Sequence, residues 1–477
     1  MDPRYIPADL SFESRYHQGF DPRFNGEDSC QSTRANTLVQ DGSRYHNERY
    51  FPDHEKGYLA DTKGKEPYTV NEREFEKTPT VTPRDSIDLE KQEAHKDIKP
   101  HDPHQPKLPF GQRLHHFTWA WYTLTMSTGG VSTLISIQPH AFPGLISIGA
   151  IFYVLNLIFF TVLCTGMVLR FTKFPGSLKE SLKHEREGLF FPTFWLSVAT
   201  IITSTQKYVV ASYDVNHSMR GWLQTSMAIA FWAYVACTFT LAFVQYSFLF
   251  IGHTYMLNQM MPSWLLPIFP VMLAGTIASV IAADQPMQAR LPILVAGMGC
   301  QGLGFTVAVI MYAHYIGRLM QAGLPNREHR GAMFIGVGPP SFTCLAFIGM
   351  ANSLPVDFDF NGDGLLDGAI LRTAALVTAL FLWVLAMWFF MIALVAVLHS
   401  RPKYFHLGWW AMVFPNTGFV IATISIGNSL QNEALLFAGN GLTIAIVIMW
   451  CFVLYHNIRA VLVADIMYPG RDEDVED

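Results

Sequence analysis

The heptapeptide VFPNTGF, near the C-terminal end of the chain, places polar and helix-breaking residues beside an aromatic ring inside a long apolar run. Phe414 offers a bulky apolar ring, Pro415 removes a backbone donor, and Asn416 and Thr417 add polar side chains. Gly418 favours departure from a regular helix. Broken backbone at membrane depth is tolerated only where it is buried in protein or lines a watery cavity, because lipid cannot satisfy the freed groups. The stretch therefore indicates a polar path.

Other polar residues accompany similar apolar runs and can form hydrogen bonds with a polar solute. No Lys or Arg falls in the middle of an apolar segment, so recognition is expected from hydroxyls, amides and helix N-termini. The residues expected to line the path are Ser127, Thr128, Gly129, Ser204, Ser279, Pro340, Ser341, Asn416 and Thr417.

Three ionisable residues lie at the ends of apolar segments. Arg170 on the inner side and Arg372 on the outer side can concentrate anions at the mouths of a path. Both can instead set the topology and extend toward the membrane interface. His116 can take up a proton with the substrate, or act as a capping or interfacial residue.

The composition separates a polar N-terminal region from a membrane-like remainder. Of the 477 residues, 50% are hydrophobic and 15% are charged, and the mean hydropathy is +0.22. Residues 1–108 are rich in charged residues and Pro, so we expect a disordered cytosolic tail there, and a short acidic cytosolic tail at 466–477. The net charge of −5 does not indicate a protein that binds nucleic acid. The cysteines show no disulfide or metal spacing, and we expect no cofactor.

Ten apolar segments between residues 109 and 465 are long enough to cross a bilayer, which needs about 20 residues of helix. They cover residues 115–136, 145–170, 189–210, 221–249, 264–282, 292–317, 331–352, 369–398, 408–427 and 434–463. Ten spans place both termini on one side of the membrane. Lys and Arg are enriched in the loops of that side, so the positive-inside rule predicts that both termini are cytosolic.

Helix-breaking residues alternate along these segments. The third, fifth, seventh and ninth contain Pro192, Pro270, Pro340 and Pro415, and the first contains Gly129 beside Gly130. The even segments are free of internal proline, except for one at the start of the sixth. The pattern predicts an all-α membrane protein of five helical hairpins around a central pore. In this arrangement the odd helices are inner and kinked, and the even helices are outer.

Several stretches resemble one family of membrane proteins. HFTWAWYTLTMSTGGV, SWLLPIFPVM, QGLGF, MFIGVGPPSF, WWAMVFPNTGFV and DIMYPGRDED are similar to the fungal malic acid permeases. These permeases belong to the tellurite-resistance and dicarboxylate transporter family, together with plant guard-cell slow anion channels and yeast sulfite pumps. The resemblance runs from about residue 107 to about residue 474 and implies ten helices around a pore, commonly in a homotrimer.

The resemblance also implies a gate and a substrate. In that family a phenylalanine on the ninth helix, directly before its break, occludes the pore, and Phe414 with Pro415 holds the matching position. An apolar ring at a constriction excludes water and makes ion entry costly. We expect plasma-membrane transport of the C4-dicarboxylates malate, succinate and fumarate. A gated channel for small anions or a sulfite exporter is the alternative. The sequence shows no nucleophile elbow and no metal motif on adjacent helix ends, so we do not expect an enzyme.

One loop departs from the family pattern. In DFDFNGDGLLDG, Asp359, Asn361, Asp363 and Asp367 follow the order of a calcium-binding loop. Ile370 replaces the acidic residue at the twelfth position, so either a weak calcium site or an ordinary acidic turn is expected.

Overall fold

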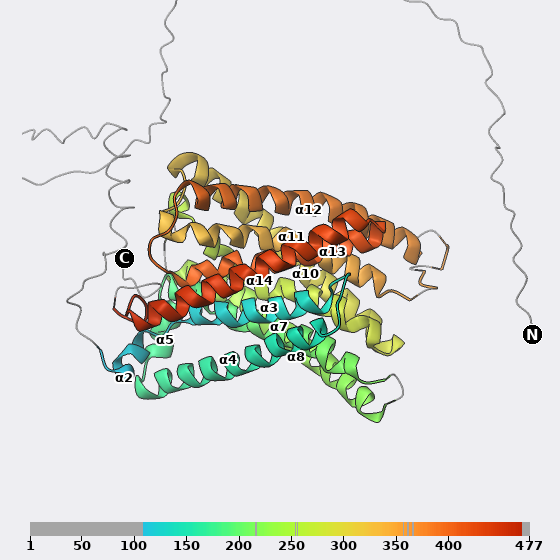
Figure 1. The fold of residues 1–477 in the computed structure, drawn as a ribbon, viewed down its shortest axis with the longest axis horizontal. Helices are drawn as coiled ribbons and strands as arrows, with labels where there is room; N and C mark the ends of the chain where they lie inside the picture. The colour runs from blue at the N-terminus through green and yellow to red at the C-terminus, as the bar shows by residue number, and fades with distance from the viewer. Residues whose placement is uncertain are drawn as a thin grey trace, which may run out of the picture. The chain divides into compact units, whose positions relative to one another are not determined.

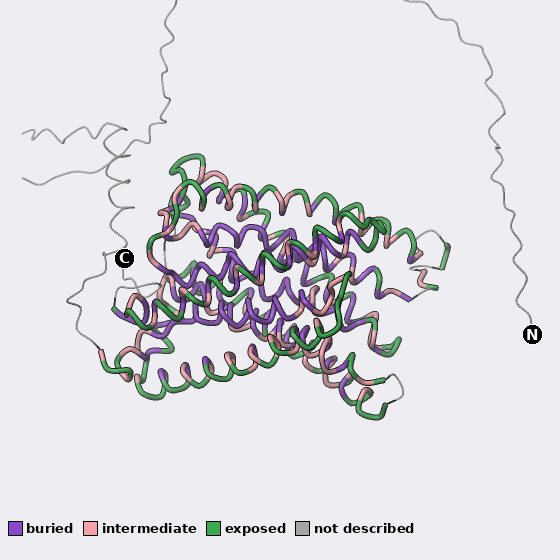
Figure 2. Tube along the Cα trace, in the orientation of Figure 1, coloured by how far each residue is buried: buried purple, intermediate pink, exposed green. Residues whose placement is uncertain are grey.

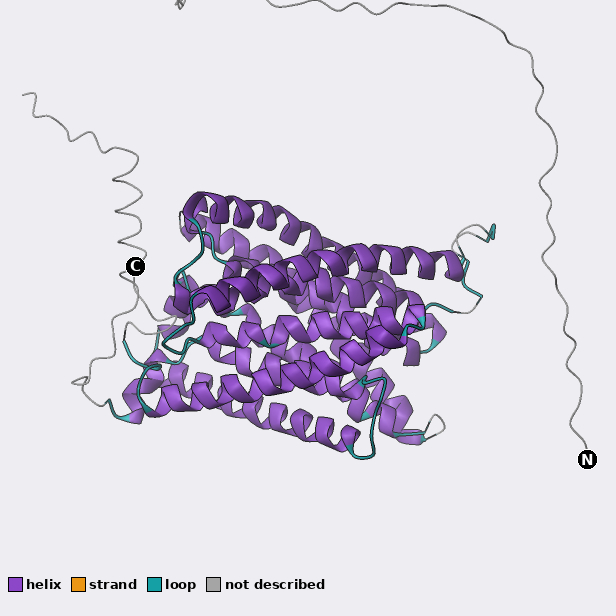
Figure 3. Cartoon of the chain, turned by 45° about the horizontal axis from the view of Figure 1, so that its top comes forward, coloured by secondary structure: helices purple, strands orange, loops and turns teal. Residues whose placement is uncertain are grey.

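The computed structural model describes residues 108–469, apart from 215, 216, 253, 255, 356, 360, 361, 365 and 366. In this part of the chain the regular structure is helical, and Figure 3 shows helices joined by loops. The expected N-terminal tail lies outside the described residues except for Leu108, and so do residues 470–477.

Five outer helices alternate with five inner helices along the chain (Figure 1). The outer ones are α4 (Leu145–Lys173), α8 (Ser218–Gly252), α10 (Met287–Ala322), α12 (Gly368–His399) and α14 (Glu433–Leu462). The inner ones are α3 (Tyr122–Ser136), α7 (Pro192–Tyr208), α9 (Phe269–Ile281), α11 (Gly338–Asn352) and α13 (Phe414–Leu430). Each inner helix is followed by an outer helix that returns, so the inner helices all run in the same direction.

Burial separates the two sets. Nine segments of the described chain are long and apolar enough to cross a membrane. Of their most apolar stretches, 67–89% of the residues are buried in the four that contain α7, α9, α11 and α13, against 11–39% in the outer helices. Figure 2 shows the same contrast, with exposed residues along α4 and α12 and buried residues between them. The broken segments of the sequence are therefore the buried ones.

The first expected span, which contains α3, is not among these nine segments. The helix has only 15 residues and is rich in Thr, Ser and Gly. It is nevertheless almost entirely buried and packs against α4, α7 and α13. A helix enclosed by other helices does not have to satisfy the hydropathy that lipid contact requires.

The inner helices form a closed cycle of contacts. α3 contacts α7, α7 contacts α9, α9 contacts α11, α11 contacts α13, and α13 contacts α3. The outer helices cover this cycle, with α4 on α3, α8 and α10 on α9, α12 on α11 and α14 on α13.

The prolines mark where the inner α-helices begin. Short segments precede the inner helices: η2 (Trp119–Trp121), α6 (Glu187–Phe190), η5 (Pro262–Ile268), η7 (Arg327–Val337) and η8 (Leu407–Met412). Proline occupies the first turn of α7, α9, α11 and α13, where its missing N–H and fixed φ suit a helix start. The breaks are therefore junctions, three of them between a 3₁₀ segment and an α-helix, rather than kinks inside one α-helix.

The sequence-based expectation for the first segment was wrong in one respect. Gly129 and Gly130 lie within the continuous helix α3, and the chain breaks earlier, at Phe117 and Thr118 between η1 (Leu114–His116) and η2. Glycine costs about 1 kcal/mol in a helix and so does not by itself end one. Similarly, Pro292 lies inside α10 rather than at its start, because that helix begins earlier, at Met287.

Short elements complete the two ends of the bundle. They are α2 (Phe110–Arg113), α5 (Ser177–Lys183), η3 (Val210–Ser212), η4 (Leu257–Gln259) and η6 (Ala282–Asp284). Beyond α14, the described start of the expected acidic tail is buried, since Tyr468 is 3% exposed. The backbone N–H of Leu108 donates to the Tyr468 hydroxyl at 3.3 Å, and the Arg113 guanidinium lies over its ring. Both ends of the described chain therefore meet.

Candidate functional site

A cavity of about 220 Å³ lies between the five inner helices. Every residue that lines it belongs to one of these helices or, in the case of Ile137, directly follows one. The lining consists of Gly130, Thr133, Ile137, Ala199, Thr200, Thr203, Lys207, Leu273, Thr276, Ser279, Val280, Phe342, Leu345, Gly349, Phe414, Thr417, Ile421, Ile424, Ser425 and Asn428.

Two phenylalanine rings form part of the cavity wall. Phe414 is the first residue of α13 and is 2% exposed, and it stacks on Phe342 of α11 with 5.0 Å between ring centroids. A Cβ atom added to Gly130 would lie 3.2 Å from the Phe414 ring, and one added to Gly418 would lie 2.9 Å from the Phe342 ring. Each ring therefore rests on a glycine of a neighbouring inner helix, which leaves it little room to shift in that direction.

Hydroxyl groups supply most of the polar wall. Thr200, Thr203 and Thr417 donate to the carbonyl oxygen three residues earlier, at 2.6–3.1 Å. Ser279 likewise donates to the Thr276 carbonyl at 2.7 Å. A hydroxyl has only one proton to give, so these groups present lone pairs rather than donors to the cavity. The hydroxyl of Thr276 has no hydrogen-bond partner among the described residues.

Lys207 is the one cationic side chain in this lining, and the sequence pattern missed it. It lies in the last turn of α7, near the end of an apolar segment, where a lysine is readily assigned to the adjacent loop. The signal available in the sequence was its spacing from Thr200 and Thr203, seven and four residues earlier, because residues at i, i+3, i+4 and i+7 share a helix face.

The predicted lining residues divide into two groups. Ser279, Thr417 and the predicted gate residue Phe414 line the cavity. The others are outside the lining, and most are buried in contacts within or between helices: Ser127, Thr128, Gly129, Ser204, Pro340, Ser341, Pro415 and Asn416.

Several of these buried residues join inner helices to their neighbours. Ser127 donates to the Trp410 carbonyl at 3.2 Å, and Thr128 accepts from the Trp450 indole at 3.0 Å. Ser204 donates to the Gly129 carbonyl at 3.4 Å. A Cβ on Gly129 would lie 2.3 Å from the Thr200 hydroxyl, so only glycine fits there without a shift.

Two more predicted residues bond back to the 3₁₀ segment that precedes their own helix. Ser341 donates to the Val337 carbonyl at 2.7 Å, and Asn416 donates to the Met412 carbonyl at 2.8 Å. The amide oxygen of Asn416 is buried and has no partner among the described residues.

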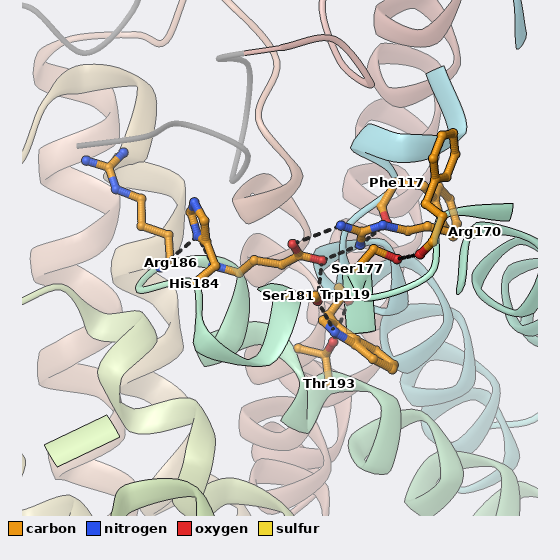
Figure 4. A network of polar contacts seen from close by, with 10 residues as sticks. Phe117, Trp119, Arg170, Ser177, Ser181, His184, Arg186 and Thr193 are labelled. Atoms are coloured by element: carbon orange, nitrogen blue, oxygen red, sulfur yellow. Dashed lines mark hydrogen bonds and ion pairs between the residues drawn. The ribbon is translucent and has the colours of Figure 1, made fainter. Parts of the chain in front are cut away.

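Arg170 is buried in an ion pair rather than directed to a mouth of the cavity (Figure 4). Its guanidinium donates to both carboxylate oxygens of Glu187, at 2.5 and 3.2 Å, and to the Phe117 carbonyl at 2.7 Å. Ser181 donates to the same carboxylate at 2.7 Å and accepts from the Trp119 indole. The network ties the end of α4 and the start of α6 to the residues that lead into α3, and Glu187 balances the charge of Arg170.

The remaining charged predictions lie away from the lining. Arg372 is half-buried and donates to the Leu354 carbonyl at 3.4 Å. His116 is half-buried in η1, and its ring packs edge-on against that of His115. Neither residue is among those that line the cavity.

The acidic loop before α12 is held by its own carboxylates. Asp359 accepts from the Gly364 backbone N–H at 2.7 Å, and Asp367 caps α12 by accepting from Ile370 N–H at 2.9 Å. Asp363 is exposed, and Asn361 lies outside the described residues. The described acidic residues thus already serve a turn and a helix cap. No group of metal-ligating side chains occurs among the described residues.

A buried histidine leads into η8 and provides a pH prediction. His406 Nδ1 accepts from the Gly408 backbone N–H at 3.0 Å. Burial, aided by nearby Arg186, lowers the pKa of His406 to about 3, against about 6.5 in an unfolded chain. At a pH between these two pKa values, His406 is protonated in the unfolded chain but neutral in the folded protein. The free energy of unfolding should therefore decrease as the pH falls below about 6.5.

The measurement is the melting temperature of the purified protein as the pH is lowered through this window. His406→Asn keeps a side chain that can cap η8 but cannot titrate. We expect the acid-side loss of stability to be smaller in His406→Asn than in the parent. Superimposable curves would show that His406 does not contribute.

Comparison with known proteins finds similarity to anion channels and transporters. A model of the voltage-dependent anion channel family matches residues 116–458. A malic acid transport protein of Schizosaccharomyces pombe is 36% identical over 77% of this chain and 84% of its own length. A sulfite efflux pump of Trichophyton rubrum is 26% identical over 71% of this chain and 89% of its own. An uncharacterized transporter of Methanocaldococcus jannaschii is 22% identical over 72% of this chain and 95% of its own. The resemblance found in the sequence is confirmed.

Proposed function

The chain belongs to the voltage-dependent anion channel family, and from this premise we propose that it transports C4-dicarboxylates, malate together with succinate and fumarate, through a path between its inner helices. It is a multi-pass membrane protein of a family of anion transporters and channels, and not an enzyme. The similarity to a malic acid transport protein supports the choice of substrate.

The proposal rests on which helices supply the residues that line the cavity. All five inner helices contribute to it, and none of the outer helices does. An aromatic pair, Phe342 and Phe414, lies at the N-terminal ends of two of these helices, while hydroxyls and Lys207 follow toward the C-terminal ends. We propose that Phe414 is the gate, because an apolar ring in a narrow path excludes water and raises the barrier for an anion.

The cellular setting completes the proposal. We place the protein in the plasma membrane with both termini in the cytosol, supported by the enrichment of Lys and Arg in the loops on that side. The cavity then belongs to the outer half of the path. We also propose a homotrimer, as the family resemblance implies, and the mass of the purified particle tests this.

A second function is favoured by one finding, the similarity to a sulfite efflux pump. A path of the same kind can conduct sulfite or another small inorganic anion, because an aromatic gate and hydroxyl wall do not themselves require two carboxylates.

Uptake into vesicles that contain the purified full chain separates these functions. Labelled malate and labelled sulfite are compared at several pH values and imposed voltages. Saturable malate uptake that excess succinate inhibits supports the proposal. Sulfite flux without malate flux overturns it in favour of the second function. Electroneutral uptake that grows at low pH indicates a protonated or coupled species, and voltage-driven flux indicates a channel-like path.

The proline beside the gate gives a further prediction. Pro415 lies in the first turn of α13, directly after Phe414, and marks the junction with η8. Pro415→Ala restores a backbone donor and allows the helix to continue, which moves the ring from its place. We expect malate flux per surface-expressed molecule to fall several-fold. The control is Pro292→Ala in outer helix α10, which should leave flux unchanged. Lower protein yield with normal flux per molecule would assign Pro415 a structural role only.

A further inference from the structure

The cavity contains few groups that can donate a hydrogen bond to an anion. Thr133, Thr200, Thr203 and Thr417 already donate to helix carbonyls, at 2.6–3.1 Å. Their oxygens face a carboxylate as acceptors, which repels rather than binds it. A dicarboxylate therefore has to find its donors among the remaining lining residues.

Lys207 is the strongest of these donors. The structure gives it no hydrogen bond or ion pair among the described residues, and its ammonium group brings three donors. Asp284 is the carboxylate whose charge acts on it. That group is already engaged by Arg220 at 3.0 Å and by the Gln206 amide at 2.5 Å. Asp284 is therefore already paired, and Lys207 has no hydrogen bond to a carboxylate among the described residues.

Thr276 is a second donor, besides Ser425 and Asn428 near the C-terminal end of α13. It lies in the middle of α9, whereas Lys207 lies in the last turn of α7, so the two are at different depths along the parallel inner helices. The hydroxyl of Thr276 is shielded from solvent and has no partner among the described residues. Turning it toward the cavity by a change of rotamer breaks no bond, and a buried hydroxyl without a partner is unfavourable. A ligand oxygen would satisfy it.

We infer that the cavity binds a dicarboxylate at two poles, with one carboxylate on Lys207 and the other on the Thr276 hydroxyl. The inference rests on the proposed function, since it specifies the substrate site of the same path. It assigns Lys207 the larger share of affinity, because a charge-assisted hydrogen bond is about twice as strong as a neutral one. It also explains how two carboxylates are distinguished from one, because a monocarboxylate leaves one pole empty.

The test uses purified full-length protein, with succinate and its monomethyl ester as probes. Lys207→Met removes the charge and keeps the length, and Lys207→Arg keeps the charge. Thr276→Val removes the hydroxyl and keeps the shape. Lys179→Met, an exposed lysine of α5 outside the cavity, is the matched control. Affinity is read from the stabilisation of the protein against heat by each probe, and KM from uptake into vesicles.

For succinate we expect Lys207→Met to weaken affinity and raise KM at least about tenfold, and Thr276→Val about threefold or more. For Lys207→Arg, the affinity and KM for succinate should stay within about threefold of the parental values. For Lys179→Met, both should equal the parental values. For the monomethyl ester, whose ester carbonyl is a weaker acceptor than a carboxylate, Lys207→Met should keep its effect and the effect of Thr276→Val should become smaller.

Two results would overturn the inference and are distinguishable from each other. In the first, the parent protein transports succinate, and both Lys207→Met and Thr276→Val bind it with parental affinity. This result would leave the proposed function intact and would rule out the two-pole site. Parent protein that neither binds nor transports any C4-dicarboxylate would overturn the proposed function and the site together. Equal effects of Thr276→Val on the diacid and the monoester would also contradict the second pole.

Discussion

Replacing Phe414 by alanine is expected to raise anion flux through the protein by about tenfold or more, which corresponds to a barrier lower by about 1.4 kcal/mol. The ring is 2% exposed, lines the cavity and stacks on Phe342. Truncation removes the apolar obstruction and leaves Lys207 and the cavity hydroxyls in place. Leak should rise for chloride as well as for malate, so selectivity should decrease. Flux is measured per surface-expressed molecule, with the current recorded for each anion.

Two variants control for packing. Phe419 lies on the same helix, is 3% exposed and stacks on Trp383, but is not among the residues that line the cavity. Phe419→Ala loses a buried ring of the same size, so it should destabilise the protein to a comparable degree, by roughly 3–5 kcal/mol, without a rise in leak. Phe414→Leu retains an apolar plug and should leak less than Phe414→Ala. Parental leak in Phe414→Ala would place the gate elsewhere.

Replacing Arg170 by methionine is expected to cause a large loss of stability, about 3–5 kcal/mol, because it leaves the Glu187 carboxylate buried without its partner. The side chains of both residues are about 5% exposed or less, so water cannot take the place of the guanidinium. The Phe117 carbonyl would lose its donor as well. The readout is the melting temperature of the purified protein, together with its surface yield.

A second substitution tests the cause. Arg170→Met combined with Glu187→Gln removes the uncompensated charge and should recover part of the lost stability. Arg372→Met is the matched single control. That arginine is half-buried and donates a long hydrogen bond of 3.4 Å to the Leu354 carbonyl, so its loss should cost less than about 1 kcal/mol. An Arg170→Met protein as stable as Arg372→Met would mean that the ion pair is not what holds these segments together.

The positions of the inner helices can be predicted from the sequence because proline is compatible with few positions in a helix. Pro192, Pro270, Pro340 and Pro415 each interrupt the backbone hydrogen bonding of an apolar segment, and lipid cannot satisfy the freed groups, so the segments that carry them are buried. Pro292 is the exception, since it lies within the first two turns of outer helix α10. Glycine gives a weaker signal. Gly129 permits a break but equally permits a close approach by Thr200, and the second is what the structure shows.

The polar residues of the site were harder to predict than the helices. A serine or threonine in an inner helix can face the cavity or a neighbouring helix, and its type does not distinguish the two. Ser279 and Ser341 illustrate this, since both are serines of inner helices and only Ser279 lines the cavity. Lys207 and Arg170 show a related difficulty. Proximity to a segment end suggests an interfacial charge, whereas the fold places one beside the cavity and the other in a buried ion pair.

The central claim is that anions pass through the cavity between the five inner helices, and chemical modification of its wall tests this directly. A cysteine is introduced at Ser425, which lines the cavity, or at Val384, which is 61% exposed on outer helix α12. Each protein is treated with a negatively charged thiol reagent in the presence and absence of malate. We expect Ser425→Cys to lose most of its malate uptake on modification, and we expect malate to slow this loss. Val384→Cys should keep its malate uptake. Complete modification of Ser425→Cys with undiminished malate uptake would contradict the claim.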